Sequence, residues 1–408
     1  MRSAIPEARG MRPRASQESG VFALAGPKYD PGAMRRDVVR RTRAEIAELA
    51  ETGLDWVTFA AKASAAVHRV IPFDRTCWHP VDPGTVLFTG GWVENMTCSG
   101  AWLAHHEYVV EDVNKWAFLA RSGYRAGSLS GATHGNLSLS ARYRSSGGTV
   151  GDELRGSFVV AGTYWGAAGF LRDPGQPWFA NEEVLVLASL STPLAEGFRR
   201  AFLLSLAPVD EAFDDALGLV LLDERGEVES VSSAAERWIE ELVEDPGGAA
   251  NSRVIQAVAA RVRQAGGSLE VPELPARARA FTRSGRWLLL HGTRLSGGDG
   301  RTAVIIQPAP SHEIASLIIQ AYGLSDRERQ VTELCAQGLS TKEMAVALHV
   351  SPYTVQDHLK VIFEKTGARS RAELVGKIFL DHYVPRFREI RNRPPRSLAS
   401  ETIDTARA

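Results

Sequence analysis

The chain between residues 324 and 379 shows four short helical patterns, and in three of them apolar residues recur every three or four positions, which predicts amphipathic helices. The recurring positions are Val331, Leu334 and Cys335 in the first segment, Met344, Ala345 and Leu348 in the second, and Val355, Leu359 and Ile362 in the third. Residues at this spacing lie on one face of a helix, so we expect the three apolar faces to meet in one small core.

Serine marks the start of each predicted helix. A serine followed three residues later by glutamate predicts a reciprocal capping box, because each side chain then accepts a backbone N–H of the other residue. Three such pairs are present: Ser325 with Glu328, Ser340 with Glu343, and Ser370 with Glu373. Ser351 precedes Pro352, which suits the first helical position because proline has no N–H to leave unsatisfied. Gly338 and Gly367 predict left-handed C-terminal caps.

The third predicted helix keeps polar side chains on its outer face. These are Tyr353, Thr354, Gln356, Asp357 and Lys360. Such side chains can reach base edges or phosphates in the major groove, whereas any one of them alone would be ordinary solvated surface. Their order, next to two other short helices, therefore predicts the recognition helix of a DNA-binding domain.

This region resembles the LuxR-type helix-turn-helix family through LSDRERQV, GLSTKEMA, SPYTVQDHL and EKTGARSRAEL, over about 55 of the 408 residues. The resemblance implies an all-α, four-helix domain at residues 324–380, whose second helix crosses the DNA backbone while its third enters the major groove. It also implies double-stranded DNA as partner, a homodimer, and an activator that contacts RNA polymerase.

By position, the resemblance implies DNA contacts from ten residues. They are Ser340, Thr341, Lys342, Ser351, Tyr353, Thr354, Gln356, Asp357, Lys360 and Lys365. Among them, Gln356, Asp357 and Lys360 are the expected base readers. The family often has lysine or arginine where this chain has Gln356. Asp357 either accepts a hydrogen bond from a cytosine amino group or only discourages non-specific binding.

The charge balance of the predicted domain is close to neutral. Residues 325–377 hold eight basic and seven acidic side chains, a net charge of about +1. Because non-specific DNA affinity comes mainly from neutralised phosphates, we expect a modest electrostatic contribution and a need for dimerisation.

Residues 34–206 predict a first α+β domain. The expected elements are helices over 35–51 and 56–69, strands near 75–79 and 86–89, a hairpin of 152–161 with 163–172, and a long helix capped at Asn181. The stretches DELRGSFVVAGTYWGAAGFLRD and PWFANEEVLVLASLSTPLAEGFRRAF resemble a GAF-type sensory domain. That resemblance implies a small-molecule ligand or a dimerisation role.

Seven of the nine tryptophans fall in this first domain. Tryptophan can line a ligand cavity, but it more often serves the core or an interface. His105 and His106 are adjacent, with His79 and Cys98 elsewhere in the domain. Adjacent histidines on a helix point about 100° apart, unlike a zinc-binding pair four residues apart, so we expect no metal site.

Residues 211–310 predict a second α+β domain, with strands at both ends and helices between them. This order resembles a PAS-like sensor, although a spacer or dimer module fits equally. Residues 311–323 predict a connecting helix whose apolar stripe of Ile314, Leu317 and Ile318 either transmits domain movement or pairs between subunits. The fold class expected is therefore multidomain: α+β GAF-like, α+β PAS-like, then the all-α LuxR-type domain.

The two ends of the chain have a different composition. Residues 1–33 mix Arg, Pro, Gly and Ser without apolar periodicity and are expected to be disordered, with Met34 as a candidate natural start. Residues 385–408 are expected to form a basic flexible tail.

Whole-chain features limit the function classes. Three cysteines without a C-x-x-C pair and no apolar run of about 18 residues predict a cytoplasmic protein without a membrane span. Sequence motifs for nucleotide loops, zinc proteases and nucleophile elbows are missing, so we expect no enzyme, no catalytic residues and no cofactor. No receiver-type phosphorylation domain is evident. The alternative to a DNA-binding regulator is a non-catalytic scaffold whose helix-turn-helix mediates protein contacts.

Overall fold

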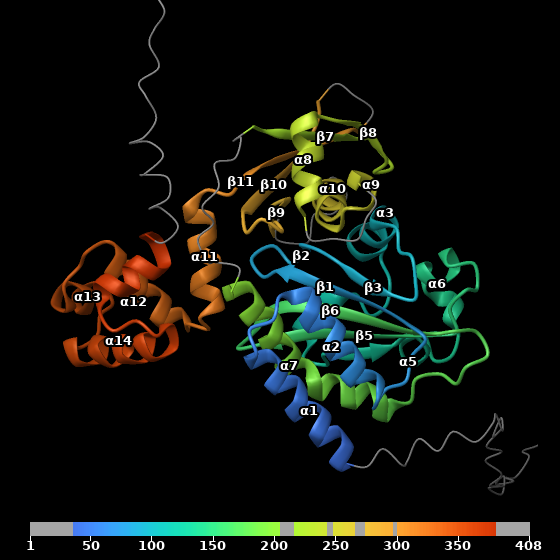
Figure 1. Cartoon of the computed structure of the whole chain (residues 1–408), viewed down its shortest axis with the longest axis horizontal. Helices are drawn as coiled ribbons and strands as arrows, with labels where there is room; N and C mark the ends of the chain where they lie inside the picture. Colours follow the sequence, from blue (N-terminus) through green and yellow to red (C-terminus); the bar gives the residue numbers. More distant parts are fainter. Residues whose placement is uncertain (1–35, 205–215, 243–247, 266–273, 297–299, 381–408) are drawn as a thin grey trace, which may run out of the picture.

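The computed structural model describes residues 36–204, 216–242, 248–265, 274–296 and 300–380. The expected N-terminal extension, the candidate start at Met34 and the basic tail lie outside these residues. Figure 1 shows a multidomain chain, with two sheet-containing units at the N-terminal side and a helical unit at the C-terminal side. Among the described residues, no helix combines the length and the apolar character needed to cross a membrane.

The N-terminal unit is built on an antiparallel sheet of order β2-β1-β6-β5-β4, with β3 also paired to β1. Its elements are α1 (Arg36–Glu51), α2 (Trp56–His68), β1 (Arg75–Asp82), β2 (Leu87–Phe88), β3 (Trp92–Glu94), α3 (Gly100–Ala104), the π-helix η2 (His105–Val109), α4 (Trp116–Ser122), β4 (Ala126–Ser128), α5 (Leu129–Ala132), the 3₁₀ helix η3 (Leu137–Leu139), α6 (Ala141–Ser145), β5 (Asp152–Val160), β6 (Thr163–Arg172) and α7 (Asn181–Leu204). The two predicted helices and the hairpin are confirmed.

Strand alternation divides this sheet between two cores. Trp78 and Trp165 face the core that α1, α2 and α7 cover, whereas their neighbours Cys77 and Tyr164 face the opposite core. Successive side chains of a strand point to opposite faces, so this one sheet contributes side chains to both cores.

The long helix is capped differently from the prediction. α7 does begin at Asn181, but the capping contact is a hydrogen bond from the Ala180 N–H to Glu183 Oε2 (2.8 Å). Asn181 is therefore the first helical residue and does not supply the cap.

The second unit has a five-stranded antiparallel sheet of order β8-β7-β11-β10-β9. Its elements are β7 (Gly218–Leu222), β8 (Val228–Val231), α8 (Ser233–Glu241), α9 (Gly248–Asn251), α10 (Arg253–Ala265), β9 (Arg277–Phe281), β10 (Trp287–Arg294) and β11 (Thr302–Pro308). α10 lies between this sheet and the N-terminal unit, so Val254 and Val258 share one core with Leu103 and Tyr108.

A buried ion pair joins the first two units. Arg279 of β9 donates to Asp82 of β1 through Nε (2.8 Å), Nη2 (2.6 Å) and its backbone N–H (3.0 Å). The exposed fractions of the two side chains are 6% and 0%. Arg279 also donates from Nη1 to the Glu313 carbonyl and to Ser316 Oγ, both at 2.9 Å. One guanidinium therefore connects both sheets to the helix that follows them.

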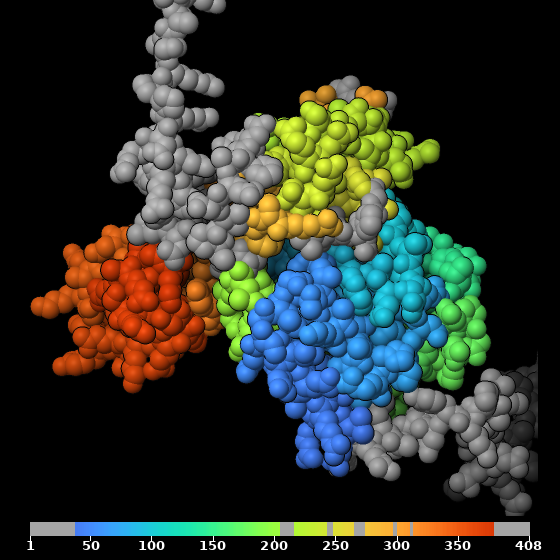
Figure 2. All heavy atoms as spheres, in the orientation of Figure 1, coloured from blue at the N-terminus to red at the C-terminus, as the bar shows by residue number. Residues whose placement is uncertain are grey.

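That helix, α11 (Ser311–Ala321), belongs to the core of the C-terminal unit. Ile314 and Ile318 pack with Val331 and Leu374 of the helical region, and Leu317 faces a small space between the two sheet-containing units. All three stripe residues are buried. The expectation that this stripe pairs between subunits is therefore wrong, because the chain's own domains cover it. Figure 2 shows the resulting C-terminal lobe, orange to red, beside the remaining body.

Candidate DNA-binding interface and sensory cavity

After α11, the C-terminal unit contains four α-helices and a final π-helix within the described residues. They are α12 (Asp326–Ala336), α13 (Thr341–Ala347), α14 (Pro352–Thr366), α15 (Arg371–Val375) and η4 (Gly376–Leu380). All nine predicted apolar positions lie in one core or against it; Leu334 is only partly buried. Figure 1 places α13 at the outer end of this lobe and α14 along its lower edge.

Side-chain caps fix the starts of these helices. The capping boxes of Ser325 with Glu328 and of Ser340 with Glu343 are both complete. The third predicted box is wrong: Ser370 caps the Glu373 N–H, but Glu373 Oε2 accepts from the Arg369 N–H (2.8 Å). The carboxylate reaches one residue further back because the chain at Ser370 is extended, with φ −152°.

A short turn sets the angle between α13 and α14. His349 adopts a left-handed conformation (φ 53°), and the Val350 N–H donates to the Ala345 carbonyl (3.0 Å). Arg327 of α12 donates to the Leu348 carbonyl (2.6 Å), which holds the end of α13. Ser351 then caps α14 by accepting the Thr354 N–H (3.1 Å), with Pro352 in the first turn as predicted.

The outer face of α14 carries the expected base readers. Gln356, Asp357 and Lys360 are exposed, and Tyr353 is 79% exposed. Thr354 is half-buried, and its hydroxyl shares a hydrogen bond with Ser351 Oγ (2.9 Å). This arrangement presents one polar helical face next to a rigid N-terminal turn.

The second helix contributes fewer free side chains than the sequence suggests. Lys342 is exposed, whereas the Ser340 hydroxyl caps the Glu343 N–H (3.4 Å). Thr341 Oγ1 accepts from Arg371, which also donates to the Leu339 carbonyl (3.3 Å). Arg371 thus positions the start of α13 from a distance of thirty residues in sequence.

Lys365 points back into its own domain. Its Nζ bonds to Glu328 Oε2 (2.7 Å) and to the Gly323 carbonyl (3.0 Å). Burial alone would raise the pKa of Glu328, but the hydrogen bonds from Lys365 and from the Ser325 N–H outweigh it and hold the pKa below its ordinary value. The charge of Lys365 is therefore partly neutralised by Glu328, so this side chain is less suited to a phosphate contact than the sequence suggests.

Sequence reasoning missed Val346, which is 76% exposed on α13. Its helical position, between the inward Ala345 and the exposed Ala347, was the only available signal. An exposed β-branched residue on this helix is suited to apolar contact with a sugar or thymine methyl group.

A cavity of about 310 Å³ lies in the N-terminal unit, between the sheet and the segment from α3 to α6. Leu103, Leu129 and Leu171 supply part of its apolar wall, and Trp102 and Trp116 line it as well. Trp78, in contrast, is fully buried in the opposite core. Two of these three tryptophans therefore line the cavity and one serves the core, while Trp178 is 49% exposed.

Buried charges stiffen one side of this cavity. Glu153 accepts from Arg142 Nε (2.6 Å) and Arg155 Nε (2.7 Å), and Arg155 also pairs with Glu107 (3.0 Å). Burial alone would raise the pKa of Glu153, but the two guanidinium groups lower it to about 2. The arginines that meet Glu153 at the cavity wall thus already have carboxylate partners.

The histidines of this unit are spread over separate contacts. His79 is buried against Phe88, and burial together with the charge of Arg253 lowers its pKa to about 3. His106 Nδ1 lies 2.9 Å from the Trp102 carbonyl oxygen. No cluster of three potential metal ligands occurs among the described residues.

Comparison with known proteins identifies the C-terminal region. Residues 323–377 match the family described as bacterial regulatory proteins, luxR family. A putative HTH-type transcriptional regulator in the exeN 3' region of Aeromonas salmonicida is 46% identical over 61 residues, 15% of this chain and 31% of that protein. The transcriptional regulatory protein UhpA of Escherichia coli K12 is 45% identical over 56 residues, 14% of this chain and 29% of that protein.

These matches span less than a third of the relatives' own length, so they characterise one domain. The C-terminal unit is a LuxR-family helix-turn-helix domain. Among solved structures, a bacteriophytochrome from R. palustris is 12% identical to this chain with a TM-score of 0.27, covering 67% of this chain and 62% of that chain.

Proposed function

We propose that this protein is a sequence-specific, DNA-binding transcriptional regulator, acting as a homodimeric activator that contacts RNA polymerase. The observation that carries the proposal is the exposed polar face of α14 on a LuxR-family helix-turn-helix domain. Gln356 and Asp357 read base edges in the major groove, with Lys360 beside them. Tyr353 and the Ser351 turn approach the backbone at the start of the same helix.

Phosphate contacts come from few residues. Lys342 and Lys360 are exposed, and no ion pair engages them within the described residues, whereas Lys365 is bonded to Glu328. A dimer that neutralises four phosphates with these two lysines gives a slope of about −3.6 for the logarithm of the binding constant against the logarithm of salt concentration. Base contacts and dimerisation must then supply much of the specific affinity.

The first two units act as sensors in this proposal. A sheet between two helical layers supports a GAF-like assignment at residues 34–206, and the order β8-β7-β11-β10-β9 supports a PAS-like assignment at residues 211–310. The cavity between β1 and α3 has the volume and the mixed lining of a small-molecule site. A ligand there shifts the arrangement of the domains only if it binds one arrangement more tightly than another.

Selection of bound fragments from genomic DNA by the purified full-length protein tests this function. Enrichment of a two-fold motif with half-sites about one helical turn apart supports a dimeric regulator. Lack of sequence enrichment at low and moderate salt contradicts it and favours the scaffold alternative.

Two substitutions test the recognition face directly. Lys360→Ala is expected to weaken operator binding by about 1–3 kcal/mol if the side chain reads a base. Gln356→Ala is expected to change the preferred base. Lys62→Ala removes the same charge from an exposed site on α2 and serves as the control. Equal operator binding by all three variants contradicts the assignment of this face.

A further inference from the structure

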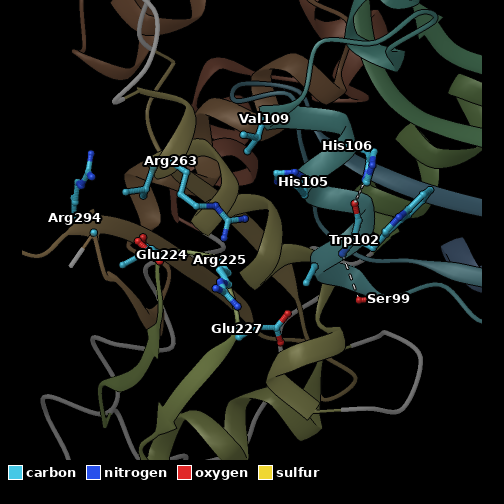
Figure 3. Close-up of a pocket in the computed structure, with 14 residues that line it drawn as sticks. Ser99, Trp102, His105, His106, Val109, Glu224, Arg225, Glu227, Arg263 and Arg294 are labelled. Carbon is cyan, nitrogen blue, oxygen red and sulfur yellow. Dashed lines mark hydrogen bonds between the residues drawn. The ribbon is translucent and has the colours of Figure 1, made fainter. Parts of the chain in front are cut away.

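A second cavity lies between the first two units. Its volume is about 780 Å³, within the range of small-molecule sites. Ser99, Trp102 and His105 line it from the N-terminal unit, and residues of the β7–β8 turn, α10 and β10 line it from the second unit. Figure 3 shows these side chains around the space between the two units.

Three arginines of the second unit line this cavity. Arg225, Arg263 and Arg294 make no side-chain hydrogen bond or ion pair with any residue in the described part of the chain. Buried arginines elsewhere behave differently: Arg155 and Arg279, for example, both bond to carboxylates. Arg263 differs from these two because its shielded nitrogens bond to no carboxylate among the described residues.

Arg263 is the most constrained of the three. All three of its guanidinium nitrogens are shielded from solvent and lack an acceptor among the described residues. The group lies against Gly226, where any added Cβ would overlap with Nη1, and Gly226 has φ 90°. Figure 3 shows Arg263 reaching from α10 toward the turn that carries Arg225. Burial lowers the pKa of Arg263, and the charges of Asp223 and Glu227 only partly oppose that effect. Neither carboxylate bonds to the guanidinium group, so an anion that enters the adjacent space and accepts from it stabilises the cation.

Arg263 is close enough to the opposite wall of the cavity to act on His105. The pKa of His105 is lowered by burial and by the charges of His106 and Arg263. The Trp102 ring packs against the His106 ring at a tilt, with 4.4 Å between ring centroids, and its Nε1 donates to Ser145 Oγ (2.8 Å). The aromatic wall is thus held in place while the positive charges face it across the cavity.

Two carboxylates at the cavity indicate which groups a ligand needs besides an anion. Glu224 and Glu227 lie on the same turn as Arg225 and are exposed at the rim. A simple anion leaves them unused, whereas a ligand with hydroxyl or amino groups can donate hydrogen bonds to them. Arginine suits phosphate in particular, because its planar donors bind two oxygens at once.

We propose that this interdomain cavity binds an organic phosphate that also carries hydroxyl or amino groups, with its phosphate near Arg225, Arg263 and Arg294. This site adjoins the cavity inside the N-terminal unit and shares Ser99 and Trp102 with it, but its arginines line only the interdomain space. The inference does not depend on DNA binding. Because both units supply walls, a bound ligand also fixes their relative orientation.

Isothermal titration of the full-length protein with AMP, adenosine and inorganic phosphate tests the proposal. AMP is expected to bind at least about tenfold more tightly than adenosine, since a charged hydrogen-bonded group contributes that much. The double variant Arg225→Ala/Arg294→Ala is expected to weaken AMP binding by at least about tenfold. Both residues are exposed, so the fold is retained.

The variant Arg41→Ala/Arg43→Ala is the matched control, because it removes two exposed arginines from α1. Its affinity for AMP is expected to equal that of the unmodified protein. Three results would overturn the proposal: no binding of AMP or phosphate up to millimolar concentration, equal binding of AMP and adenosine, or equal losses in the double variant and its control. Duplex binding measured on the same samples separates failure of this site from failure of the proposed function.

Discussion

The ion pair between Asp82 and Arg279 is predicted to hold the first two units and α11 together. Both side chains are almost completely buried, and the Asp82 carboxylate accepts from three donors of Arg279 and from the Gly84 N–H (2.9 Å). Asp82→Ala leaves a buried guanidinium without its counter-ion. We expect the free energy of unfolding to fall by about 3–5 kcal/mol, the usual cost of breaking a buried pair from one side.

The size of the coupling follows from a double-mutant cycle. Arg279→Met is expected to cost a similar amount, because it leaves the carboxylate unpaired and removes the bonds to Glu313 and Ser316. The double variant Asp82→Ala/Arg279→Met contains neither buried charge, so its loss is expected to be smaller than the sum by at least about 2 kcal/mol.

Denaturant unfolding followed by tryptophan fluorescence and by far-ultraviolet circular dichroism measures these energies. Agreement between the two probes checks that the units unfold together. Arg301→Met breaks the pair with Glu229, whose side chains are 50% and 33% exposed, and serves as the control with an expected cost of about 0–1 kcal/mol. The reasoning would be refuted if the loss of unfolding free energy in the double variant equalled the sum of the two single losses within about 0.5 kcal/mol. Equal losses in Asp82→Ala and in the control Arg301→Met would refute it as well.

Three further predictions concern the C-terminal unit. His349→Gly removes a side chain from a left-handed position (φ 53°) and is expected to stabilise the fold by up to about 1 kcal/mol, seen as a higher melting temperature; a lower one would contradict it. Glu328 has a folded pKa below its ordinary 4.5, so its stabilising effect is present at neutral pH and is lost as pH falls below about 4.5 through the folded value. Lys365→Met is therefore expected to flatten the acid-side loss of stability, and an unchanged pH profile would refute this. Leu317→Asp buries an unpaired charge and is expected to cost more than about 3 kcal/mol in thermal unfolding, whereas Leu317→Met is expected to be tolerated.

The sequence determined the local architecture of the DNA-binding unit. Serine caps, helical periodicity and the Ser351-Pro352 start depend on residues three or four positions apart, so they can be predicted from the sequence alone. The same is true of the β5–β6 hairpin, whose turn uses Ala161 and Gly162 at positive φ. The capping box predicted at Ser370 was wrong because Glu373 can accept from the N–H of Arg369 as well as from that of Ser370. The local backbone conformation decides which N–H it accepts.

The tertiary structure decided which surfaces are free. The stripe of α11 looks equally suited to another subunit and to its own chain, but packing against Val331 and Leu374 covers it. In the same way, Lys365 is a free cation in the sequence and a partner of Glu328 in the fold. Periodicity shows that a face is apolar or charged, but it does not show what lies opposite.

Contacts between distant residues were beyond the reach of the sequence. Asp82 and Arg279 are separated by 197 positions, and the interdomain cavity combines His105 with Arg263 from another unit. From the sequence alone, each of these side chains would be predicted to lie on the polar surface. Their roles arise only when two cores, formed from different parts of the chain, bring them into one desolvated space where charges must be paired.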